Sequence, residues 1–481
     1  MGSGKVTSTS ELFDFQGKHV TVAGLGVSGV PAARALHARG AVVTVVNDGD
    51  DARAREQAAA LEALGITVRL GDGASLPEGT ELIVTAPGWK PDKPLFLAAE
   101  KAGVPVWGDV ELAWRLRGHD GREAAPWLAV TGTNGKTTTV QMLASILTAA
   151  GLRTAAVGNI GVSLLDAVLG EEEYDVLAVE LSSYQLHWAP SLRAHSAAVL
   201  NLAPDHLDWH GSMEAYARDK GRIYEGNRVA CVYNVEDKAT EDLVREADVE
   251  EGCRAVGFTL GAPAPSQLGV VDGILVDRAF VANRQKNAQE LAEVCDVNPS
   301  APHNIANALA AAALARAFGV PAQAVREGLR AFRPDAHRIA HVADIDSVAY
   351  VDDSKATNTH AAEASLASYE SIVWIAGGLA KGATFDELVA KSAKRLRGAV
   401  LIGADRALIR EALARHAPQV PVVDLDGTDT GAMLQAVTEA KRLAQPGDTV
   451  LLAPACASMD MFTNYNQRGD AFAAAVRELE A

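Results

Sequence analysis

The stretch Gly132-Thr-Asn-Gly-Lys-Thr-Thr138 combines the residue types that bind phosphate groups. Glycines allow a tight turn, backbone N–H groups and the helix dipole face the anion, lysine adds charge, and a threonine hydroxyl can ligate Mg²⁺. The full P-loop pattern would need glycine five positions before Gly135, where this sequence has Val130, so the match is to a shorter variant, GTNGKT. The stretch predicts a nucleotide site, and the alternative is a turn that only caps a helix, with Lys136 solvated.

A second glycine turn, Gly24-Leu-Gly-Val-Ser-Gly29, satisfies the dinucleotide pattern GxGxxG. Asp48 ends the next expected strand about 20 residues further on, as that fingerprint requires. The turn can bind NAD(P) or another diphosphate-bearing nucleotide, or it can be only a close contact between strand and helix. Two phosphate-binding turns in separate domains fit a substrate nucleotide in one domain and ATP in the other.

Acidic and imidazole groups follow two expected strands of the middle region. Glu180 closes the apolar run of residues 175–180, at the carboxyl end of a strand, where Mg²⁺ is often held beside a phosphate loop. Asn201-Leu-Ala-Pro-Asp-His-Leu-Asp208 follows another strand and places His206 between two acids. Each group could instead be a solvated or structural side chain. Lys220, on an expected helix, has the pattern of an ordinary solvated cation.

The elements that position these groups alternate between apolar strands and helices along the whole chain. Alternation of this kind predicts parallel sheets with helices on their faces. The expected strands cover residues 19–26, 42–47, 81–88, 127–131, 175–180, 197–202, 229–234, 347–352, 371–376, 398–403, 421–425 and 448–453. The expected helices include residues 28–39, 53–64 and 303–318. Polar breaks at residues 117–126 and 332–335 divide the pattern into three α/β domains.

The predicted domains are residues 1–122, 123–334 and 335–481. The first is expected to be Rossmann-like, the central one a P-loop-type ATP-binding domain with a mostly parallel sheet, and the last Rossmann-like again. A chain of 481 residues is too long for one core, and 48% hydrophobic with 22% charged residues is typical of a soluble globular protein.

Charge and composition exclude several classes of function. A net charge of −17 argues against nucleic acid as the main partner. No apolar run approaches the ~20 residues of a membrane span, and the polar first 20 residues contain no secretory signal. The four cysteines, Cys231, Cys253, Cys295 and Cys456, form no CxxC motif, so free thiols in a reducing cytoplasm are expected.

The motifs taken together resemble the Mur ligases. The resemblance rests on GTNGKT, VELSSYQL with Glu180, the Asp205–Asp208 segment, the helix from His303, DDSKATN at residues 352–358, and ACASMD with NYNQRG at residues 455–460 and 464–469. It covers nearly the whole chain in order. The last two motifs are similar to those of the family member that adds D-glutamate, and the Asp-Asn-Pro-Arg motif of the diaminopimelate- or lysine-adding member is absent from the sequence.

The resemblance implies an ATP-dependent acid–amino-acid ligase of peptidoglycan precursor synthesis, and so of cell-wall biogenesis, cell shape and cell division. ATP would convert the carboxylate of UDP-N-acetylmuramoyl-L-alanine into an acyl phosphate, which the amine of D-glutamate then attacks. The implied cofactors are ATP and two Mg²⁺ ions. The implied partners are these small molecules only, with no nucleic acid and no membrane insertion, and the chain is expected to act as a cytoplasmic monomer.

The resemblance also implies roles for individual residues. The catalytic residues would be Lys136, Glu180, His206 and Lys220. ATP would be bound by Gly132, Thr133, Asn134, Gly135, Lys136, Thr137, Thr138, Asn307, Arg338 and Asp353. The UDP-substrate would be bound by Gly26, Val27, Ser28, Asp48, Gly88, Asn159 and His206. D-Glutamate would be bound by Thr357, Lys381, Ser458, Tyr465 and Lys355. Mg²⁺ would be held by Thr137, Glu180, His206 and Lys220, the last as a carbamate.

Some positions depart from the family pattern. Ala340 stands where family members usually have glutamate, Ala86 where a serine is frequent, and Tyr465 where phenylalanine is common. Residues 118–126 and 260–300 are longer than the pattern requires and receive no functional assignment. The alternatives to the D-glutamate ligase are another Mur-type ligase, a Rossmann NAD-dependent oxidoreductase in which GTNGKT has no role, and a nucleotide-binding module without catalysis.

Overall fold

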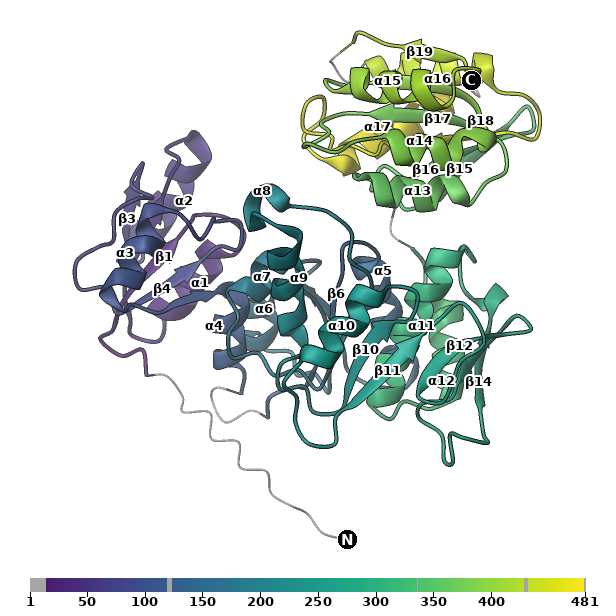
Figure 1. The fold of residues 1–481 in the computed structure, drawn as a ribbon. Helices are drawn as coiled ribbons and strands as arrows, with labels where there is room; N and C mark the ends of the chain where they lie inside the picture. Colours follow the sequence, from purple (N-terminus) through teal and green to yellow (C-terminus); the bar gives the residue numbers. More distant parts are fainter. Residues whose placement is uncertain (1–13, 119–122, 335, 428–430, 480–481) are drawn as a thin grey trace. The chain divides into compact units, whose positions relative to one another are not determined.

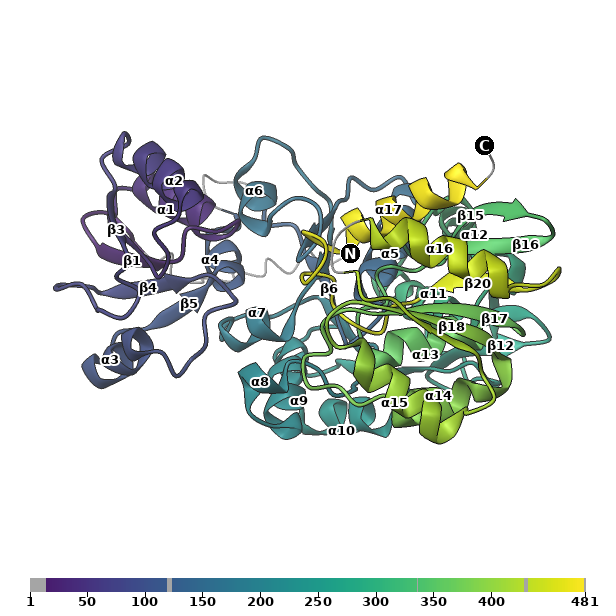
Figure 2. The same ribbon diagram turned by 90° about the horizontal axis from the view of Figure 1, so that it is seen from above.

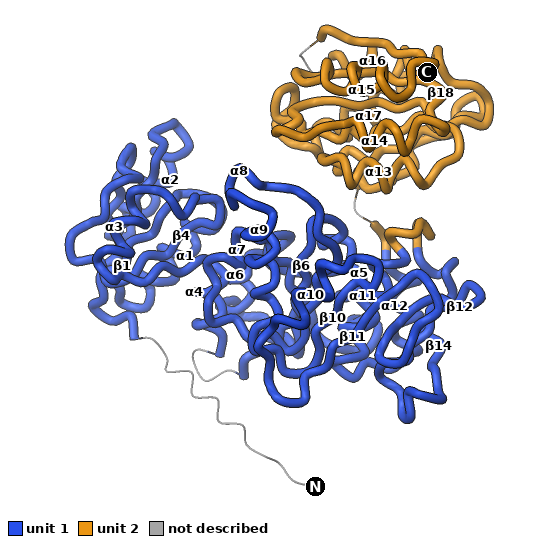
Figure 3. The backbone as a smooth tube through the Cα atoms, viewed as in Figure 1, with its two compact units in different colours: residues 1–297, 305–332 blue, residues 298–304, 333–481 orange. Residues whose placement is uncertain are grey.

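The computed structural model describes residues 14–118, 123–334, 336–427 and 431–479 of the 481-residue chain (Figure 1). Contacts divide the chain into two compact units, residues 1–297 with 305–332 and residues 298–304 with 333–481 (Figure 3). The first unit carries two sheets and the second carries one. Residues 119–122, in the expected linker, and residue 335, at the second expected boundary, lie outside the described residues.

The first sheet is parallel throughout and has the order β3-β2-β1-β4-β5. Its strands are β1 (His19–Ala23), β2 (Val42–Asn47), β3 (Thr67–Leu70), β4 (Leu82–Thr85) and β5 (Val106–Gly108). Its helices are α1 (Gly29–His37), α2 (Ala52–Glu62), α3 (Pro94–Ala102) and α4 (Asp109–Leu116). Figure 2 shows α1 and α2 over one face of the sheet and α3 over the other. Strand order reverses beside β1, and a ligand site is expected there at the carboxyl ends of the strands.

The second sheet has nine strands in the order β14-β13-β12-β11-β10-β9-β6-β8-β7. Its strands are β6 (Trp127–Thr131), β7 (Ala156–Gly158), β8 (Leu177–Glu180), β9 (Ser196–Val199), β10 (Ala230–Asn234), β11 (Arg254–Phe258), β12 (Gln267–Val271), β13 (Ile274–Asp277) and β14 (Gln289–Glu293). Its helices are α5 (Lys136–Ala149), α6 (Leu164–Leu169), α7 (Ser183–His187), α8 (Leu207–His210), α9 (Met213–Gly221), α10 (Lys238–Glu246), α11 (Pro302–Ala317) and α12 (Ala322–Ala331). Strands β6 to β12 are parallel to one another. Strands β13 and β14 extend the sheet at the β12 edge in antiparallel pairs.

Apolar residues fill both faces of this second sheet. Strand β6 is buried along its whole length, as expected for a central parallel strand. Helices α5, α11 and α12 pack on one face, where the alanines of α11 from Ala308 to Ala315 are fully buried. Small side chains let this helix lie close against the sheet, and its place explains the alanine-rich sequence.

The third sheet has the order β15-β16-β20-β17-β18-β19, with β15 antiparallel to β16 and the other pairs parallel. Its strands are β15 (Ala340–Ile345), β16 (Val348–Asp352), β17 (Ile372–Gly377), β18 (Leu396–Ile402), β19 (Val422–Asp424) and β20 (Thr449–Leu452). Its helices are α13 (Thr359–Ala367), α14 (Asp386–Ser392), α15 (Arg406–His416), α16 (Ala432–Leu443) and α17 (Tyr465–Glu478). Helices α13 to α15 cover one face, and α16 and α17 cover the other (Figure 2).

Every strand expected from the sequence has a counterpart within a few residues, and the α/β class with three sheets is confirmed. The expectation for residues 260–300 was incomplete. This region contains β12, β13 and β14, which widen the central sheet by an antiparallel extension. Among the described residues, no helix combines the length and apolar character needed to cross a bilayer.

Candidate active site

The glycine turn after β6 is held in one conformation by Asn201, which follows β9. The Asn134 backbone N–H donates to Asn201 Oδ1 (2.9 Å), and Asn201 Nδ2 donates to the Asn134 carbonyl (3.1 Å). Gly132 and Gly135 have φ values of +155° and +84°, which only glycine adopts without strain. Gly135 is the N-cap of α5, so the turn presents the positive end of a 14-residue helix. This geometry suits an anion.

Lys136 and Asn307 lie at the same turn. Lys136 Nζ donates to the carbonyls of Gly132 and Thr133, both at 2.9 Å. A Cβ placed on Gly135 would lie 2.4 Å from Asn307 Oδ1, so α11 brings this amide directly against the loop. Thr137 is partly exposed in the first turn of α5, and Thr138 is buried. The fold therefore brings the expected ATP-binding residues of the first unit together.

Glu180 ends β8 beside this loop, because its strand pairs directly with β6 in the register Val130 to Glu180. Its side chain is buried. Oε1 accepts a hydrogen bond from Asn159 Nδ2 (3.1 Å), whereas Oε2 is buried without a hydrogen-bond partner. A buried carboxylate oxygen without a partner is costly, and a cation would satisfy it.

Lys220 is buried on α9, in contrast to the solvated cation that its sequence pattern indicates. Its Nζ donates to the Gly132 carbonyl (2.9 Å) and lies 3.4 Å from Thr131 Oγ1. Burial lowers the pKa of Lys220 well below its ordinary value, and Lys136 lowers it further, against the opposing effect of Asp205 and Glu180. The lowered pKa favours the neutral amine, which is the reactive form of a lysine.

His206 ends the loop between β9 and α8 of the central domain. Its backbone is left-handed (φ +54°), and its ring centroid lies 4.9 Å from that of Tyr184, four residues after Glu180. The following residues contact the first sheet: Lys90 Nζ donates to the Asp208 carbonyl (2.7 Å), and Trp209 Nε1 donates to the Gly88 carbonyl (3.3 Å). The loop that carries His206 thus meets the loop of Gly88.

The first glycine turn is open above Gly26. A Cβ at Gly29 would lie 1.9 Å from the Gly24 carbonyl oxygen, so this glycine permits the tight strand–helix contact, whereas no atom lies within 4 Å of a Cβ at Gly26. Val27 is 80% exposed. Ser28 Oγ donates to Asp109 Oδ2 (2.8 Å) at the start of α4. Asp48 lies at the carboxyl end of β2, exposed and paired with Lys93.

The second unit gathers its own set of predicted residues around β16 and β20. Asp353 is buried, and the Ile339 backbone N–H donates to its Oδ1 (3.3 Å). Desolvation raises the pKa of Asp353 to about 6, although the nearby charge of Arg338 opposes the rise. Lys355 Nζ lies 3.8 Å from the centroid of the Tyr465 ring.

Lys381 and Ser458 lie on two segments that pair with each other. The Leu379 and Ala457 backbones exchange two hydrogen bonds of 2.9 Å. Lys381 has a left-handed backbone (φ +50°), and Ser458 is buried. Thr357 follows Lys355, whose carbonyl accepts from the Thr357 N–H (2.8 Å).

Arg468 holds these segments together and was not assigned a role from the sequence. It is buried, and its guanidinium donates to Ser354 Oγ (3.0 Å), to the Ser354 carbonyl (2.8 Å) and to the Cys456 carbonyl (3.1 Å). Burial lowers the pKa of Arg468 to about 10. Arg468 belongs to the NYNQRG motif. The motif was recognised in the sequence, but the role of its arginine in joining these segments was not predicted.

A further group that sequence reasoning missed surrounds Asp219, the neighbour of Lys220. Asp219 Oδ2 accepts from His187 Nδ1 (2.9 Å) and His210 Nδ1 (3.0 Å). Desolvation opposes ionisation of Asp219, but hydrogen bonds from the two histidines outweigh it and lower the pKa to about 2. These partners are scattered over the sequence, so no local signal links them.

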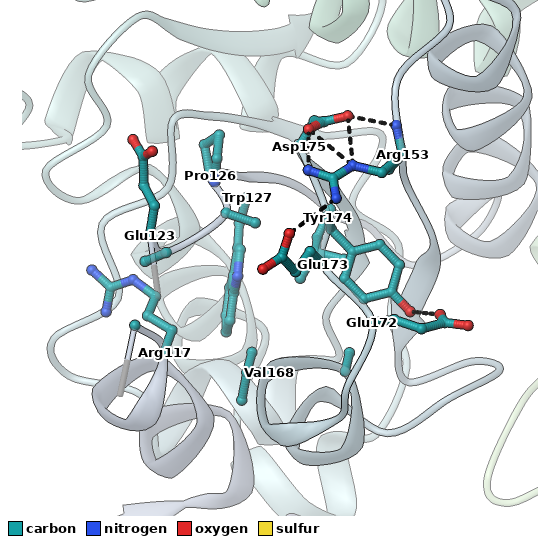
Figure 4. Close-up of a pocket in the computed structure, with 15 residues that line it drawn as sticks. Arg117, Glu123, Pro126, Trp127, Arg153, Val168, Glu172, Glu173, Tyr174 and Asp175 are labelled. Carbon is teal, nitrogen blue, oxygen red and sulfur yellow. Dashed lines mark hydrogen bonds and ion pairs between the residues drawn. The ribbon is translucent and has the colours of Figure 1, made fainter. Parts of the chain in front are cut away.

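A cavity of about 350 Å³ lies at the junction of α4 and β6, lined by Arg117, Trp127, Arg153 and Glu173 among others (Figure 4). Its lining contains none of the predicted site residues.

Within the described ranges there is no cluster of three or more His, Cys, Asp or Glu side chains that could hold a metal ion. The predicted Mg²⁺ set is of a different kind, because it draws on a threonine and a modified lysine. Cys231 and Cys253, distant in sequence, approach to 3.9 Å between their Sγ atoms as free thiols.

Comparison with known proteins identifies the family. Residues 130–315 match the model of the Mur ligase middle domain, and residues 337–456 match that of the Mur ligase glutamate ligase domain. A UDP-N-acetylmuramoylalanine–D-glutamate ligase of Streptomyces coelicolor is 88% identical over 468 residues, covering 97% of this chain and 99% of that protein. A protein of the same name from Thermobifida fusca is 59% identical, with the same coverage.

Solved structures agree on the fold. The MurF ligase of Thermotoga maritima in complex with ADP has a TM-score of 0.56 at 15% identity and covers 97% of each chain. The UDP-N-acetylmuramate–alanine ligase MurC of the same organism has a TM-score of 0.56 at 18% identity and covers 96% of this chain and 99% of its own. The chain therefore belongs to the Mur ligase family, in the branch whose curated members are named UDP-N-acetylmuramoylalanine–D-glutamate ligases.

Proposed function

We propose that this chain is an ATP-dependent ligase that joins D-glutamate to UDP-N-acetylmuramoyl-L-alanine in peptidoglycan precursor synthesis. The names of relatives at 88% and 59% identity support the substrate pair. The observation that carries the chemistry is the placement of Lys136, Glu180 and Lys220 around one anion-binding turn.

The substrate carboxylate is a poor electrophile, and transfer of the ATP γ-phosphoryl group converts one of its oxygens into a leaving group. The N–H groups of the glycine turn and Lys136 would hold the phosphates, with Lys136 exchanging its loop carbonyls for phosphate oxygens. Charge develops on the transferred phosphoryl group, and fixed donors stabilise it because they need no reorganisation. Asn307, buried against Gly135, would then face the adenine.

The residues fit a bound Mg²⁺. Glu180 Oε2 is a buried oxygen without a partner, and Lys220 is a buried amine with a lowered pKa. Such an amine adds CO₂ with loss of a proton, and the resulting carbamate offers anionic oxygens in place of a cation. Glu180, His206, Thr137 and carbamylated Lys220 would hold two Mg²⁺ ions, which when bound neutralise negative charge on the phosphates.

The first glycine turn would bind the sugar nucleotide. The open space above Gly26, the exposed Val27 and the start of α1 suit a diphosphate. Ser28, Asp48, Gly88, Asn159 and His206 complete the proposed set. The contact between the loops of Gly88 and His206 supports a single path from this turn to Glu180.

The second unit would bind the amino acid and part of the nucleotide. Lys381 and Thr357 would hold one carboxylate of D-glutamate, and Ser458 with the backbone near Tyr465 the other. Lys355 would lie between the phosphate and the amino acid, and Arg338 and Asp353 at the ribose and phosphates. Paired lysine and hydroxyl donors suit a ligand with two carboxylates. We expect the chain to act as a cytoplasmic monomer, without nucleic acid or membrane partners.

A phosphate-release assay tests the proposal. Release should require ATP, Mg²⁺, UDP-N-acetylmuramoyl-L-alanine and D-glutamate together, and Lys136→Ala should abolish it. Faster turnover with L-glutamate or L-lysine would refute the D-glutamate assignment but keep the ligase class. Absence of ATP consumption with the complete mixture would refute the function itself.

A further inference from the structure

His210 is a fully buried imidazole at the end of α8, the short helix that starts directly after His206. Neither composition nor motif marks it in the sequence. Both of its ring nitrogens have side-chain partners, and these come from two other elements, α7 and α9.

The two hydrogen bonds join segments that are distant along the chain. His210 Nδ1 lies 3.0 Å from Asp219 Oδ2, and Nε2 lies 2.9 Å from Ser183 Oγ. A carboxylate only accepts, so Nδ1 carries a proton and donates to Asp219. In the neutral ring Nε2 then accepts from the Ser183 hydroxyl.

The flat faces and edges of the ring make further contacts. His210 stacks on Tyr184 with a centroid distance of 5.6 Å and an interplanar angle of 8°, and it meets Tyr216 edge to face at 5.2 Å. The Tyr216 hydroxyl lies 3.0 Å from Thr133 Oγ1 in the phosphate-binding turn. The imidazole therefore contacts α7 and α9 directly and the phosphate-binding turn through one tyrosine.

Each contacted segment carries one of the proposed metal-holding residues. Ser183 is three residues after Glu180, Asp219 immediately precedes Lys220, and His210 itself ends the helix that follows His206. We infer that His210 is a positioning residue, which fixes the segments of Glu180, His206 and Lys220 in one mutual arrangement through Ser183 and Asp219. The inference rests on the proposed function, because it assigns His210 to the arrangement of that site.

The chain offers a matched control in His187. Its Nδ1 binds the same Asp219 Oδ2 at 2.9 Å, but its side chain is 25% exposed and it packs edge-on against Trp188 and Trp209. His187 lies on α7, so its bond to Asp219 joins α7 to α9 but does not hold the segment of His206. A general need for hydrogen bonds at Asp219, or for a tie between α7 and α9, would make the two histidines equivalent, whereas positioning of the His206 segment against both helices makes only His210 important.

The test compares His210→Phe with His187→Phe by two measurements. One is the binding of Mn²⁺ in the presence of a non-hydrolysable ATP analogue, followed by electron paramagnetic resonance. The other is steady-state phosphate release. Residues that orient metal ligands typically change metal affinity by about 10- to 100-fold. We expect His210→Phe to weaken Mn²⁺ binding about tenfold and to lower kcat, with the KM for the UDP-substrate within about twofold, and His187→Phe to change neither by more than about twofold.

Ser183→Ala covers the case in which His210→Phe does not fold, because it deletes only the hydroxyl and leaves the helix cap at Ser182 in place. It should weaken Mn²⁺ binding in the same direction, and in a folded double variant with His210→Phe the two effects should not add. Mn²⁺ affinity within twofold of the wild type in Ser183→Ala, or equal losses in both histidine variants, would overturn the inference. Failure of the proposed function is distinguishable, since wild-type protein would then release no phosphate while the Mn²⁺ comparison could still be made.

Discussion

Replacing the buried carboxyl of Asp353 with an amide should make the second unit respond differently to acid. Asp353 is 9% exposed, and desolvation raises its pKa from the ordinary 3.8 to about 6. Asp353→Asn keeps the shape of the side chain and removes its titration. The change therefore isolates the free energy that burial of this charge costs.

The magnitude follows from the two pKa values. A rise of about 2.2 pH units corresponds to about 3 kcal/mol at about 1.4 kcal/mol per unit. The folded state binds the proton more tightly than the unfolded state, so this group adds stability as the pH falls through 6 toward 3.8 and costs stability above 6. Between pH 7 and pH 4.5 the wild type should gain about 2 kcal/mol relative to Asp353→Asn.

The assay is urea denaturation at several pH values, with a reporter in the second unit. Trp374 is the one tryptophan of residues 335–481 and is fully buried, so a fluorine label on tryptophan gives a signal for that unit, assigned with Trp374→Phe. Asp346→Asn, an exposed position of the same unit, controls for the change in net charge. A constant difference between wild type and Asp353→Asn from pH 7 to pH 4.5 would refute the argument from burial.

Three further changes give separate expectations. Gly135→Ala places a Cβ at φ +84° and 2.4 Å from Asn307 Oδ1. The strained backbone should cost about 1–2 kcal/mol and lower the melting temperature, and titration of the folded variant with an ATP analogue should show affinity at least about tenfold weaker. Arg468→Leu leaves two buried carbonyls without donors. The free energy of unfolding of the second unit, measured by the same urea assay, should fall by about 3 kcal/mol. A loss below about 1 kcal/mol would contradict the proposed role of Arg468 in holding these segments together. Lys220→Ala should stop phosphate release, and acetate or formate should restore part of it; restoration by neither, in a folded variant, would count against the carbamate.

A strand or hairpin could be predicted only where the residues that define it are neighbours in the sequence. The expected parallel strands were readable because each is an apolar run, and several of them, such as β1, β6 and β17, are followed by a glycine turn. The hairpin of β12 and β13 was not predicted, although its sequence carries a signal: Asp272-Gly273 stands between two apolar runs, and its φ values of +49° and +77° are those of the favoured two-residue turn. The hairpin of β15 and β16 turns at Asp346 and Ser347 with φ values of +52° and +64° and no glycine, so its sequence carries no such signal.

The candidate site divides in the same way. Residues whose role depends on backbone geometry, such as Gly132 and Gly135, can be predicted from the sequence by their type and spacing. Residues whose role depends on burial do not, because burial is decided by elements far away in the chain. Lys220 shows the difference, since its sequence pattern is that of a surface lysine, whereas in the structure it lies buried beneath the phosphate-binding turn.

The chemistry of the site depends on that distant packing. A lowered pKa of Lys220 requires that water be excluded and that a second positive charge lie nearby. Burial of Lys220 under the turn and the adjacent Lys136 meet both conditions. An acceptor oxygen for a cation requires that Glu180 keep one carboxylate oxygen unpaired, which the register of β8 on β6 and the single bond from Asn159 provide. The phosphate loop alone would bind nucleotides as many turns do. In the proposed function, the buried lysine and the half-satisfied carboxylate beside the loop add the groups that phosphoryl transfer needs. Any change that admits water to Lys220 should then impair turnover before it impairs ATP binding.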